Sequence, residues 1–222
     1  MAGATAAPRQ GEVSGLIKIL CKASSINVRK VLWACEEIGL PHTREDWGSG
    51  FRDTQVPEFL ALNPNGLVPV VVIDDLVLWE SNTILRYLAA SHGAHELLPA
   101  APRERAQVEK WMDWQATDLN SSWRYAFQAL VRKNPAFQNA AEIDASVVAW
   151  SRNLAILEGR LAANAYVAGD HFTLADVPIG LSVNRWFMTP IPDRPDFPAV
   201  TAYYDRLSHR PPFVRHGRNG VP

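Results

Sequence analysis

The sequence predicts two domains, an α/β domain followed by an all-α domain. Up to about residue 91, short apolar runs of strand length alternate with segments of helical periodicity. From residue 102 onward, only helical periodicity recurs. A chain of 222 residues, 47% of them hydrophobic, can bury one large core or two modest ones, and we expect two domains.

The first half of the α/β domain is predicted to run strand, helix, strand, helix. Residues 16–21 are a strand candidate, residues 43–46 are a shorter one, and a brief helix is expected near residues 57–62. The longer helix between the two strands should end at Gly39, because glycine favours the left-handed conformation that closes helices. Its apolar face consists of Val28, Val31, Leu32 and Cys35.

The second half of this domain is predicted to be a hairpin and a helix. Two β-branched, apolar runs, 68–73 and 76–79, flank the polar pair Asp74-Asp75, which favours an antiparallel hairpin. Ser81 follows as the expected N-cap of the last helix. The order β-α-β-α-β-β-α is a thioredoxin-like layout, with a mixed four-stranded sheet and helices on its faces. We assign residues 16–91 to this domain.

Residues 92–101 read as a linker, and residues 102–222 as the all-helical domain. A long helix is expected from Pro102 to about Lys133, and a second one with an apolar face between Ile143 and Leu161. Apolar residues recur every three to four positions along the second helix, which indicates that this helix supplies the core of the domain.

The end of the chain carries a capping motif and two expected helices. Thr173 and Asp176 form a capping pair, so we interpret both as structural. Pro178 is expected to bend the helix that follows, and residues 184–186 to end it. A last helix is expected over 198–207, before an irregular basic tail.

Composition and charge exclude several classes of function. The formal net charge of -1 and the lack of a basic block give no footprint for nucleic acid or an anionic membrane as partner. Residues 1–15 lack the apolar centre of a secretory signal, so we expect a disordered extension. Cys21 and Cys35 do not form a Cys-x-x-Cys pair, which favours a reducing, cytoplasmic compartment. The scattered histidines predict no metal site, and no P-loop or dinucleotide-binding glycine pattern occurs.

Two polar clusters stand at expected helix starts. Ser24-Ser25-x-Asn27 precedes the first long helix, and Glu80-Ser81 precedes the last helix of the α/β domain. Each cluster has an ordinary interpretation as a helix cap. The alternative is functional, because free N-H groups and the helix dipole at such a terminus attract an anion. Pro69, inside a strand-like run, marks an edge or a cis bond.

Taken together, these motifs resemble the cytosolic glutathione transferases, in particular the serine-type, bacterial theta/beta-like branch. The resemblance rests on Asn-Pro-Asn-Gly-x-Val-Pro at 63–69, on Glu-Ser-Asn-Thr-Ile-Leu-x-Tyr-Leu at 80–88, and on Ser-x-Asn-Val-x-Lys-Val-x-Trp at 25–33. It covers residues 16 to about 210. It implies a cytoplasmic detoxification enzyme that uses glutathione as co-substrate, without a metal, and a small hydrophobic electrophile as second substrate.

The resemblance also implies roles for individual residues. Ser25, with Asn27, would stabilise the glutathione thiolate, and Ser24 is the nearby competitor. A cis bond before Pro69 would let the backbone of Val68 pair with the cysteinyl part of glutathione. The γ-glutamyl end would be held by Glu80 and Ser81.

The chain departs from the family pattern where the glycyl end of glutathione would lie. Leu67 stands where relatives often have lysine, and Thr54 lies in the preceding loop where a basic or amide side chain is common. Arg52 or Gln55 could substitute there. On the long helix, the stripe Thr117, Ser121 and Arg124 resembles the second-substrate wall, with an ordinary solvated face as the alternative.

The family also pairs its subunits, so we expect a homodimer. Arg86, Tyr87 and Met112 are candidates for its interface, and Asp118 for a contact with the neighbouring γ-glutamyl amine. The competing hypothesis is a non-catalytic ligand-binding or assembly module on the same fold. Conjugation, dehalogenation, isomerisation and peroxide reduction all stay open as reactions.

Overall fold

The N-terminal domain is built on a mixed sheet with the strand order β2-β1-β3-β4. The structure is a computed structural model that describes residues 15–222, so the expected extension lies outside the described residues except for Gly15. Parallel pairing joins β1 to β2, and antiparallel pairing joins β1 to β3 and β3 to β4. The four strands are β1 (Ile17–Cys21), β2 (His42–Asp46), β3 (Val70–Ile73) and β4 (Leu76–Leu78).

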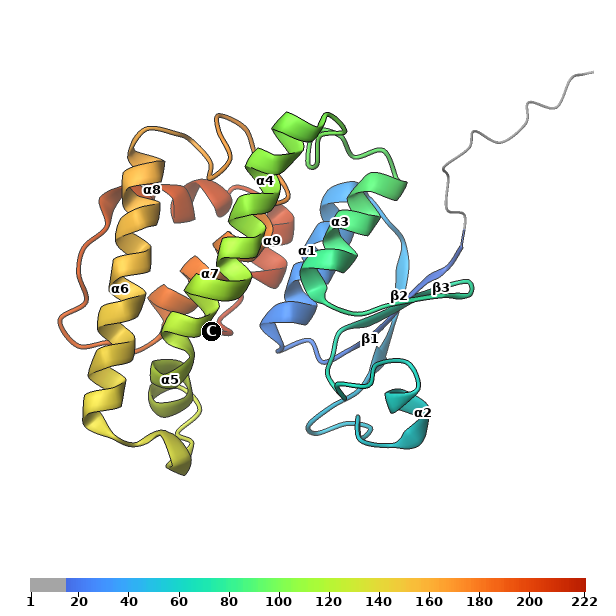
Figure 1. The fold of residues 1–222 in the computed structure, drawn as a ribbon, viewed down its shortest axis with the longest axis horizontal. Coiled ribbons are helices and arrows are strands. Elements are labelled where there is room, and N and C mark those ends of the chain that lie inside the picture. The colour runs from blue at the N-terminus through green and yellow to red at the C-terminus, as the bar shows by residue number, and fades with distance from the viewer. Residues whose placement is uncertain (1–14) are drawn as a thin grey trace, which may run out of the picture.

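Helices cover both faces of this sheet. On one face α1 (Ile26–Ile38) and α3 (Ser81–Ser91) lie side by side, between the sheet and the helical domain (Figure 1). On the other face α2 (Pro57–Leu60) is a short helix that covers a small apolar cluster. Phe59 of α2 is fully buried there against Trp47, with ring centroids 4.9 Å apart. The thioredoxin-like layout is confirmed.

The C-terminal domain is helical throughout its regular structure. Its long first helix is continuous but contains one π-helical turn, so it divides into α4 (Pro102–Trp114), η1 (Gln115–Leu119) and α5 (Asn120–Leu130). The remaining elements are the 3-10 turn η2 (Pro135–Phe137), α6 (Ala140–Ala162), α7 (Asp176–Met188), α8 (Pro198–Leu207) and α9 (Pro211–His216).

One apolar core joins the two domains. Trp33 of α1 is fully buried, and its ring lies 4.9 Å from that of Phe213 of α9. In the helical domain, Trp150 and Trp186 pack edge to face at 5.0 Å. Gly180 of α7 allows the close contact between these layers, because a Cβ there would lie 2.6 Å from Leu207 Cδ1. The domain interface is therefore part of the core.

Three expectations about helix boundaries are wrong. Ser81 is the first residue of α3 and not its N-cap, a position taken by Glu80. Residues 184–186 lie inside α7, because contacts with the end of the chain hold them there: Asn184 Nδ2 donates to Val221 O at 2.9 Å. Pro178 lies in the first turn of α7, where proline removes no intrahelical hydrogen bond, and the bend expected there stays a prediction. The tail expected to be irregular contains α9.

Candidate active site

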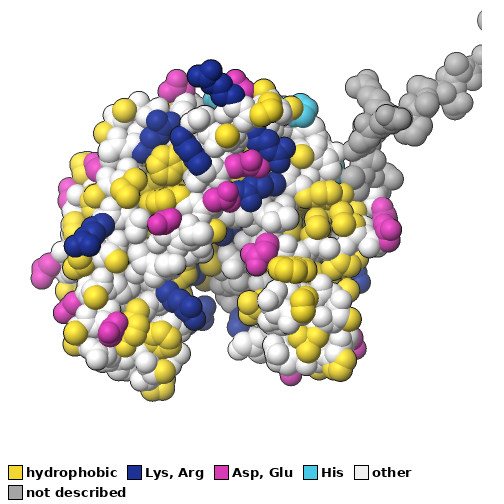
Figure 2. Space-filling view, in the orientation of Figure 1, with side chains coloured by type: hydrophobic (Ala, Val, Ile, Leu, Met, Phe, Trp, Pro, Cys, Tyr) yellow, Lys and Arg dark blue, Asp and Glu magenta, His cyan; other side chains and the backbone are white. Residues whose placement is uncertain are grey.

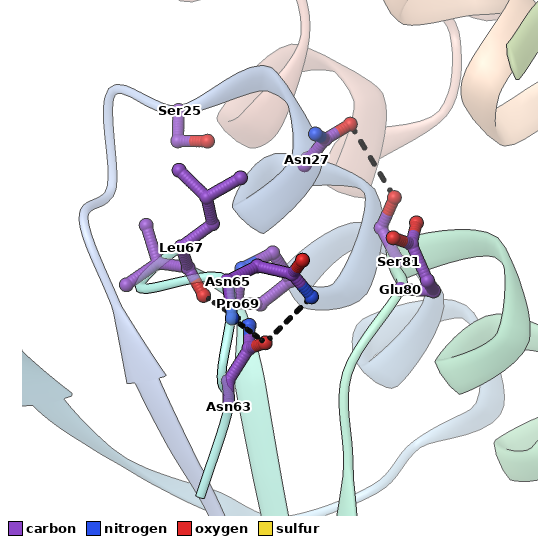
Figure 3. Close-up of a pocket in the computed structure, with 9 residues that line it drawn as sticks. Ser25, Asn27, Asn63, Asn65, Leu67, Pro69, Glu80 and Ser81 are labelled. Atoms are coloured by element: carbon purple, nitrogen blue, oxygen red, sulfur yellow. Dashed lines mark hydrogen bonds between the residues drawn. The ribbon is translucent and has the colours of Figure 1, made fainter. Parts of the chain in front are cut away.

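A cavity of about 240 Å³ opens where the loop before β3 faces the starts of α1 and α3 (Figure 3). Its walls come from three separate segments of the N-terminal domain, which only the folded sheet brings together. Most of its polar atoms are amide or hydroxyl groups. The lining residues are Ser25, Asn27, Asn63, Asn65, Leu67, Val68, Pro69, Glu80 and Ser81.

Ser25 is the N-cap of α1, yet its hydroxyl makes no capping hydrogen bond. The backbone fixes its position, since Ser25 N donates to Lys22 O at 2.8 Å and Ser25 O accepts from Arg29 N at 2.9 Å. The side chain points toward the cavity (Figure 3). A half-buried hydroxyl at the positive end of a 13-residue helix can donate a hydrogen bond to an anion.

The opposite wall is the loop that enters β3. The Val68–Pro69 peptide bond is cis, as expected. Asn63 organises the loop: its Nδ2 donates to Leu67 O at 2.7 Å, while its Oδ1 accepts from Asn65 N at 3.1 Å. Gly66, at φ 61°, has the amide of Gln55 against its Cα. This loop therefore holds the Val68 backbone at the cavity wall.

Glu80 and Ser81 form the third wall, at the start of α3. Glu80 has φ 69°, a conformation that residues other than glycine rarely adopt and that is often found at functional sites. Ser81 Oγ donates to Asn27 Oδ1 at 3.3 Å, which links α3 to α1 across the cavity (Figure 3). The unpaired N-H groups of the first turn of α3 make this wall suited to a carboxylate.

A buried lysine lies beneath these walls, at the domain interface. Lys30 is 1% exposed, and its Nζ donates to Gln115 Oε1 at 2.9 Å and to Asn82 Oδ1 at 3.4 Å. Gln115, in the π-helical turn, in turn donates from Nε2 to Ser182 Oγ at 2.9 Å. Burial and, to a smaller extent, the charge of Arg185 lower the pKa of Lys30 to about 7, although the carboxylate of Glu80 acts in the opposite direction. Sequence reasoning missed this network, because its four members are distant in the chain.

A second cavity, of about 310 Å³, lies between the N-terminus of α1 and the helical domain. In Figure 2 a notch separates the two domains, and Lys and Arg side chains lie along it. Ser25 lines both cavities, so it marks the point where they meet. The other lining residues are Lys22, Ser24, Ile26, Trp123, Arg124, Phe127, Gln128, Arg132 and Arg185.

The predicted glutathione-site residues divide into two groups. Six come together around the first cavity, and they are Ser25, Asn27, Val68, Pro69, Glu80 and Ser81. Arg52 does not line it, because it stacks on Trp47 and pairs with Glu45 and Glu58. Gln55 lies behind the loop, where its Nε2 is 3.4 Å from Gly66 O.

The predicted second-substrate stripe is also divided. Arg124 lines the second cavity, beside Ser24 and Ser25. Thr117 and Ser121 line a different, shallow hollow between η1, α5 and α6. Sequence reasoning missed Trp123 and Phe127, although their i, i+4 spacing beside Arg124 places them on one helix face and could have revealed them. Arg132 and Arg185 carry no such local signal.

The described residues were compared with the patterns of metal ligands and of membrane-spanning helices. Among residues 15–222, no three His, Cys, Asp or Glu side chains are grouped as metal ligands would be. Within the same range, no helix has the length and apolar character needed to span a bilayer.

Fold and site together define a class: a thioredoxin-like domain with a cavity at the starts of two helices, joined to a helical domain that completes a second cavity. The profile "Glutathione S-transferase, N-terminal domain" matches residues 24–91, and "Glutathione S-transferase, C-terminal domain" matches residues 123–211. The chain belongs to the glutathione S-transferase family and is an enzyme of that class.

Individual relatives agree with this assignment. Glutathione S-transferase GstB of Escherichia coli K12 is 38% identical over 198 residues, which cover 88% of this chain and 95% of that protein. The theta class enzyme of Xanthomonas axonopodis pv. citri, solved with glutathione bound, is 39% identical with a TM-score of 0.87, covering 94% of this chain and all of that one. Probable elongation factor 1-gamma 2 of Arabidopsis thaliana is 31% identical over 161 residues, which are 72% of this chain but 38% of that protein.

Proposed function

We propose that this glutathione S-transferase binds glutathione in the first cavity and stabilises its thiolate through the Ser25 hydroxyl. The observation that carries the proposal is the position of Ser25, which lines both cavities and has no competing capping bond. The thiolate would then attack a small electrophile with a hydrophobic body in the second cavity, against Trp123 and Phe127. Ser24 lines only the second cavity, which favours Ser25 over it.

The physical case for a hydroxyl is that glutathione itself brings the nucleophile. A free thiol has a pKa near 8.5, so at pH 7 only a few per cent is thiolate. A hydrogen bond to an anion stabilises it by roughly 1.5–3 kcal/mol, which lowers the thiol pKa by roughly one to two units. The N-terminus of α1 acts in the same direction.

Glutathione would lie across the cavity from α3 to the loop before β3. Its γ-glutamyl carboxylate would bind the Ser81 hydroxyl and first-turn N-H groups, with Glu80 facing the ammonium, and its cysteinyl backbone would pair with Val68. The relative at 39% identity was solved with glutathione bound, which supports glutathione as the ligand. The glycyl end would then reach Asn65 and Leu67, while Gln55 supports the loop from behind.

The test is the pKa of the bound thiol. Ultraviolet absorbance of the thiolate, titrated with glutathione bound, should show a pKa that Ser25→Ala raises by about one to two units. Ser24→Ala is the matched control and should leave the titration unchanged. A shift in Ser24→Ala alone would transfer the role to Ser24, and no shift in either variant would exclude a serine mechanism.

The competing hypothesis, a non-catalytic ligand-binding or assembly module on the same fold, is disfavoured by the assignment to the glutathione S-transferases. Retention on immobilised glutathione together with conjugation of a generic aryl halide separates the two. We further propose that the enzyme is a cytoplasmic homodimer that serves detoxification, as the family resemblance implies.

A further inference from the structure

The second cavity has a strongly cationic wall. Lys22, Arg124, Arg132 and Arg185 line it, and no acidic residue does. Within residues 15–222, none of these four side chains forms an ion pair with an Asp or Glu. The chain as a whole has a net charge of -1, so this concentration of positive charge is local.

Arg185 is the deepest of the four cations. It is 3% exposed, and its guanidinium lies 4.3 Å from the ring centre of Trp123 and 4.0 Å from that of Phe127. Its Nε is buried without a hydrogen-bond partner among the described residues, and its Nη2 is 3.5 Å from Pro222 O. Arg29 Nη2 takes the same oxygen at 2.8 Å, so Arg185 holds only a shared acceptor.

A buried guanidinium that shares its acceptor and has an unpartnered Nε is costly, because desolvation penalises the charge. Burial, together with the nearby charges of Arg29 and Arg132, lowers the pKa of Arg185 to about 9. An anion in the cavity would supply the missing acceptors and reduce this repulsion. Planar guanidinium groups match a carboxylate in bidentate geometry.

We infer that the second substrate is an electrophile that carries a carboxylate. This inference rests on the proposed function, since it requires the thiolate at Ser25. The apolar body of the substrate would lie on Trp123 and Phe127, its carboxylate would bind the arginine side chains, and its reactive carbon would face Ser25. The inferred substrate therefore differs from the hydrophobic electrophile expected from the family in that it also carries an anionic group.

The reaction is a substitution in which atoms and electrons balance. The thiol proton leaves to solvent when the thiolate forms. The sulfur lone pair then makes a C-S bond to the carbon that bears a halide, and the halide leaves with the electron pair of the broken bond. The carboxylate takes no part in the chemistry and serves only for binding.

Glutathione has a glycyl carboxylate of its own, which is the alternative anion for this wall. Its expected path runs from Ser81 over Val68 toward Asn65, which lies within the N-terminal domain. Three of the four cations belong instead to the helical domain: Arg124 lies in α5, Arg132 follows α5 by two residues, and Arg185 lies in α7. The experiment distinguishes the two sources directly.

The test compares the conjugation of 4-chloro-3-nitrobenzoate with that of 4-chloro-3-nitrobenzamide. Each enzymatic rate is divided by the rate of the same compound with free glutathione alone, which removes the difference in intrinsic reactivity. The wild type should prefer the benzoate. In Arg124→Gln/Arg132→Gln the ratio of the two kcat/KM values should fall by about tenfold or more, as expected for the loss of charge-assisted hydrogen bonds. Arg152→Gln, an exposed arginine of α6 outside the cavity, is the matched control and should keep the wild-type ratio.

Calorimetry with the two glutathione conjugates gives an answer that needs no turnover. Tighter binding of the carboxylate conjugate, lost in the double variant, supports the inference, and equal binding of both conjugates overturns it. If the double variant weakens binding of glutathione itself as much as that of the conjugate, the wall holds the glycyl carboxylate and the inference fails. If the wild type conjugates the benzamide as efficiently as the benzoate, only the inference of a carboxylate on the substrate fails. If the protein binds neither glutathione nor either conjugate, the proposed function fails as well.

Discussion

At the scale of single residues, Ser81 shows how a site residue can be held ready before its ligand arrives. Its hydroxyl donates to Asn27 Oδ1 at 3.3 Å, a long and therefore weak bond. Exchange of this bond for a stronger one to a carboxylate costs little. Ser81 is the first residue of α3, so its backbone N-H has no partner within the helix and also faces the ligand.

We expect Ser81→Ala to weaken glutathione binding by about tenfold or more, since a hydrogen bond to a charged group contributes roughly 1.5–3 kcal/mol. Isothermal calorimetry well below the melting temperature measures this. Ser91→Ala is the matched control at the other end of α3, where the hydroxyl bonds Tyr87 O at 2.7 Å. Equal affinity in wild type and Ser81→Ala would place the γ-glutamyl end elsewhere.

At the scale of elements, two glycines in helices predict opposite responses to the same substitution. Gly180 of α7 faces Leu207 and Trp33, and a Cβ would lie 2.6 Å from Leu207 Cδ1 and 3.0 Å from Trp33 Cη2. Gly180→Ala should therefore destabilise the protein by about 1–3 kcal/mol, despite the better helix propensity of alanine. Chemical unfolding measures the change.

Gly159 on α6 supplies the control, because a Cβ there meets no other atom within 4 Å. Gly159→Ala should stabilise the protein by about 0.5–1 kcal/mol through helix propensity alone. If both alanines stabilise, the contact between α7 and α1 is looser than these distances indicate.

The start of α7 provides a prediction about pH. Asp176 is fully buried and accepts from Thr173 N at 2.8 Å, Val167 N at 3.1 Å and Tyr203 Oη at 3.0 Å. Burial nevertheless raises its pKa from 3.8 to about 6. The folded state therefore binds a proton that the unfolded state releases between about pH 4 and 6, so stability from this group is present below pH 4 and is lost as the pH rises through about 6.

The loss amounts to about 3 kcal/mol at most, at roughly 1.4 kcal/mol per pKa unit. Asp176→Asn should remove this slope, and the exposed Asp144→Asn should keep it. The measurement is the free energy of unfolding from pH 4 to pH 7 for wild type and both variants. A slope in Asp176→Asn that equals the wild-type slope would contradict the raised pKa.

The sequence predicted the elements better than their ends. The β3-β4 hairpin and the Gly39 cap follow from local chemistry, the Val68–Pro69 cis bond follows from the family resemblance, and all three are confirmed. Helix α9 could not be predicted, because distant partners hold it. His216 Nε2 lies 2.7 Å from Glu36 Oε1 of α1, and Phe213 packs on Trp33.

The same reasoning divides the candidate site. The family resemblance, carried by motifs of fixed local spacing, predicted the six residues around the first cavity. The second cavity depends on how α5 and α7 dock against α1, and the pattern of polar residues along α5 alone could not separate Arg124 from Thr117 and Ser121. Arg185 lies deep in the core, where sequence reasoning expects an apolar residue.

At the scale of the whole molecule, the proposed homodimer would use the surface of α3 and α4. One candidate contact is wrong, since Met112 is 0% exposed and belongs to the core. Arg86 pairs with Glu109 and Asp113 within the chain, and Tyr87 is half-buried. Asp118 is exposed and accepts from Thr117 Oγ1 at 2.9 Å.

Sedimentation at micromolar concentration should give a species of twice 24.6 kDa. Tyr87→Glu should shift this equilibrium toward the single chain, because it puts a charge without a partner at the expected interface. Glu142→Gln, on the exposed first turn of α6 and away from this surface, is a control that should leave the mass unchanged. A wild-type species of 24.6 kDa alone would exclude a stable dimer.

The π-helical turn η1 has a consequence for chain length. An α-helical residue advances the helix by about 100°, so deletion of the exposed Ala116 would let the turn close as an α-helix and rotate everything after it by that angle. Helix α5 would survive, yet Trp123 and Arg124 would leave the cavity wall beside Ser25. Two homologues that differ in length by one residue at η1 would thus share every strand and helix and yet accept different substrates. Insertion and deletion at this turn are therefore a route to new specificity that needs no substitution in the cavity.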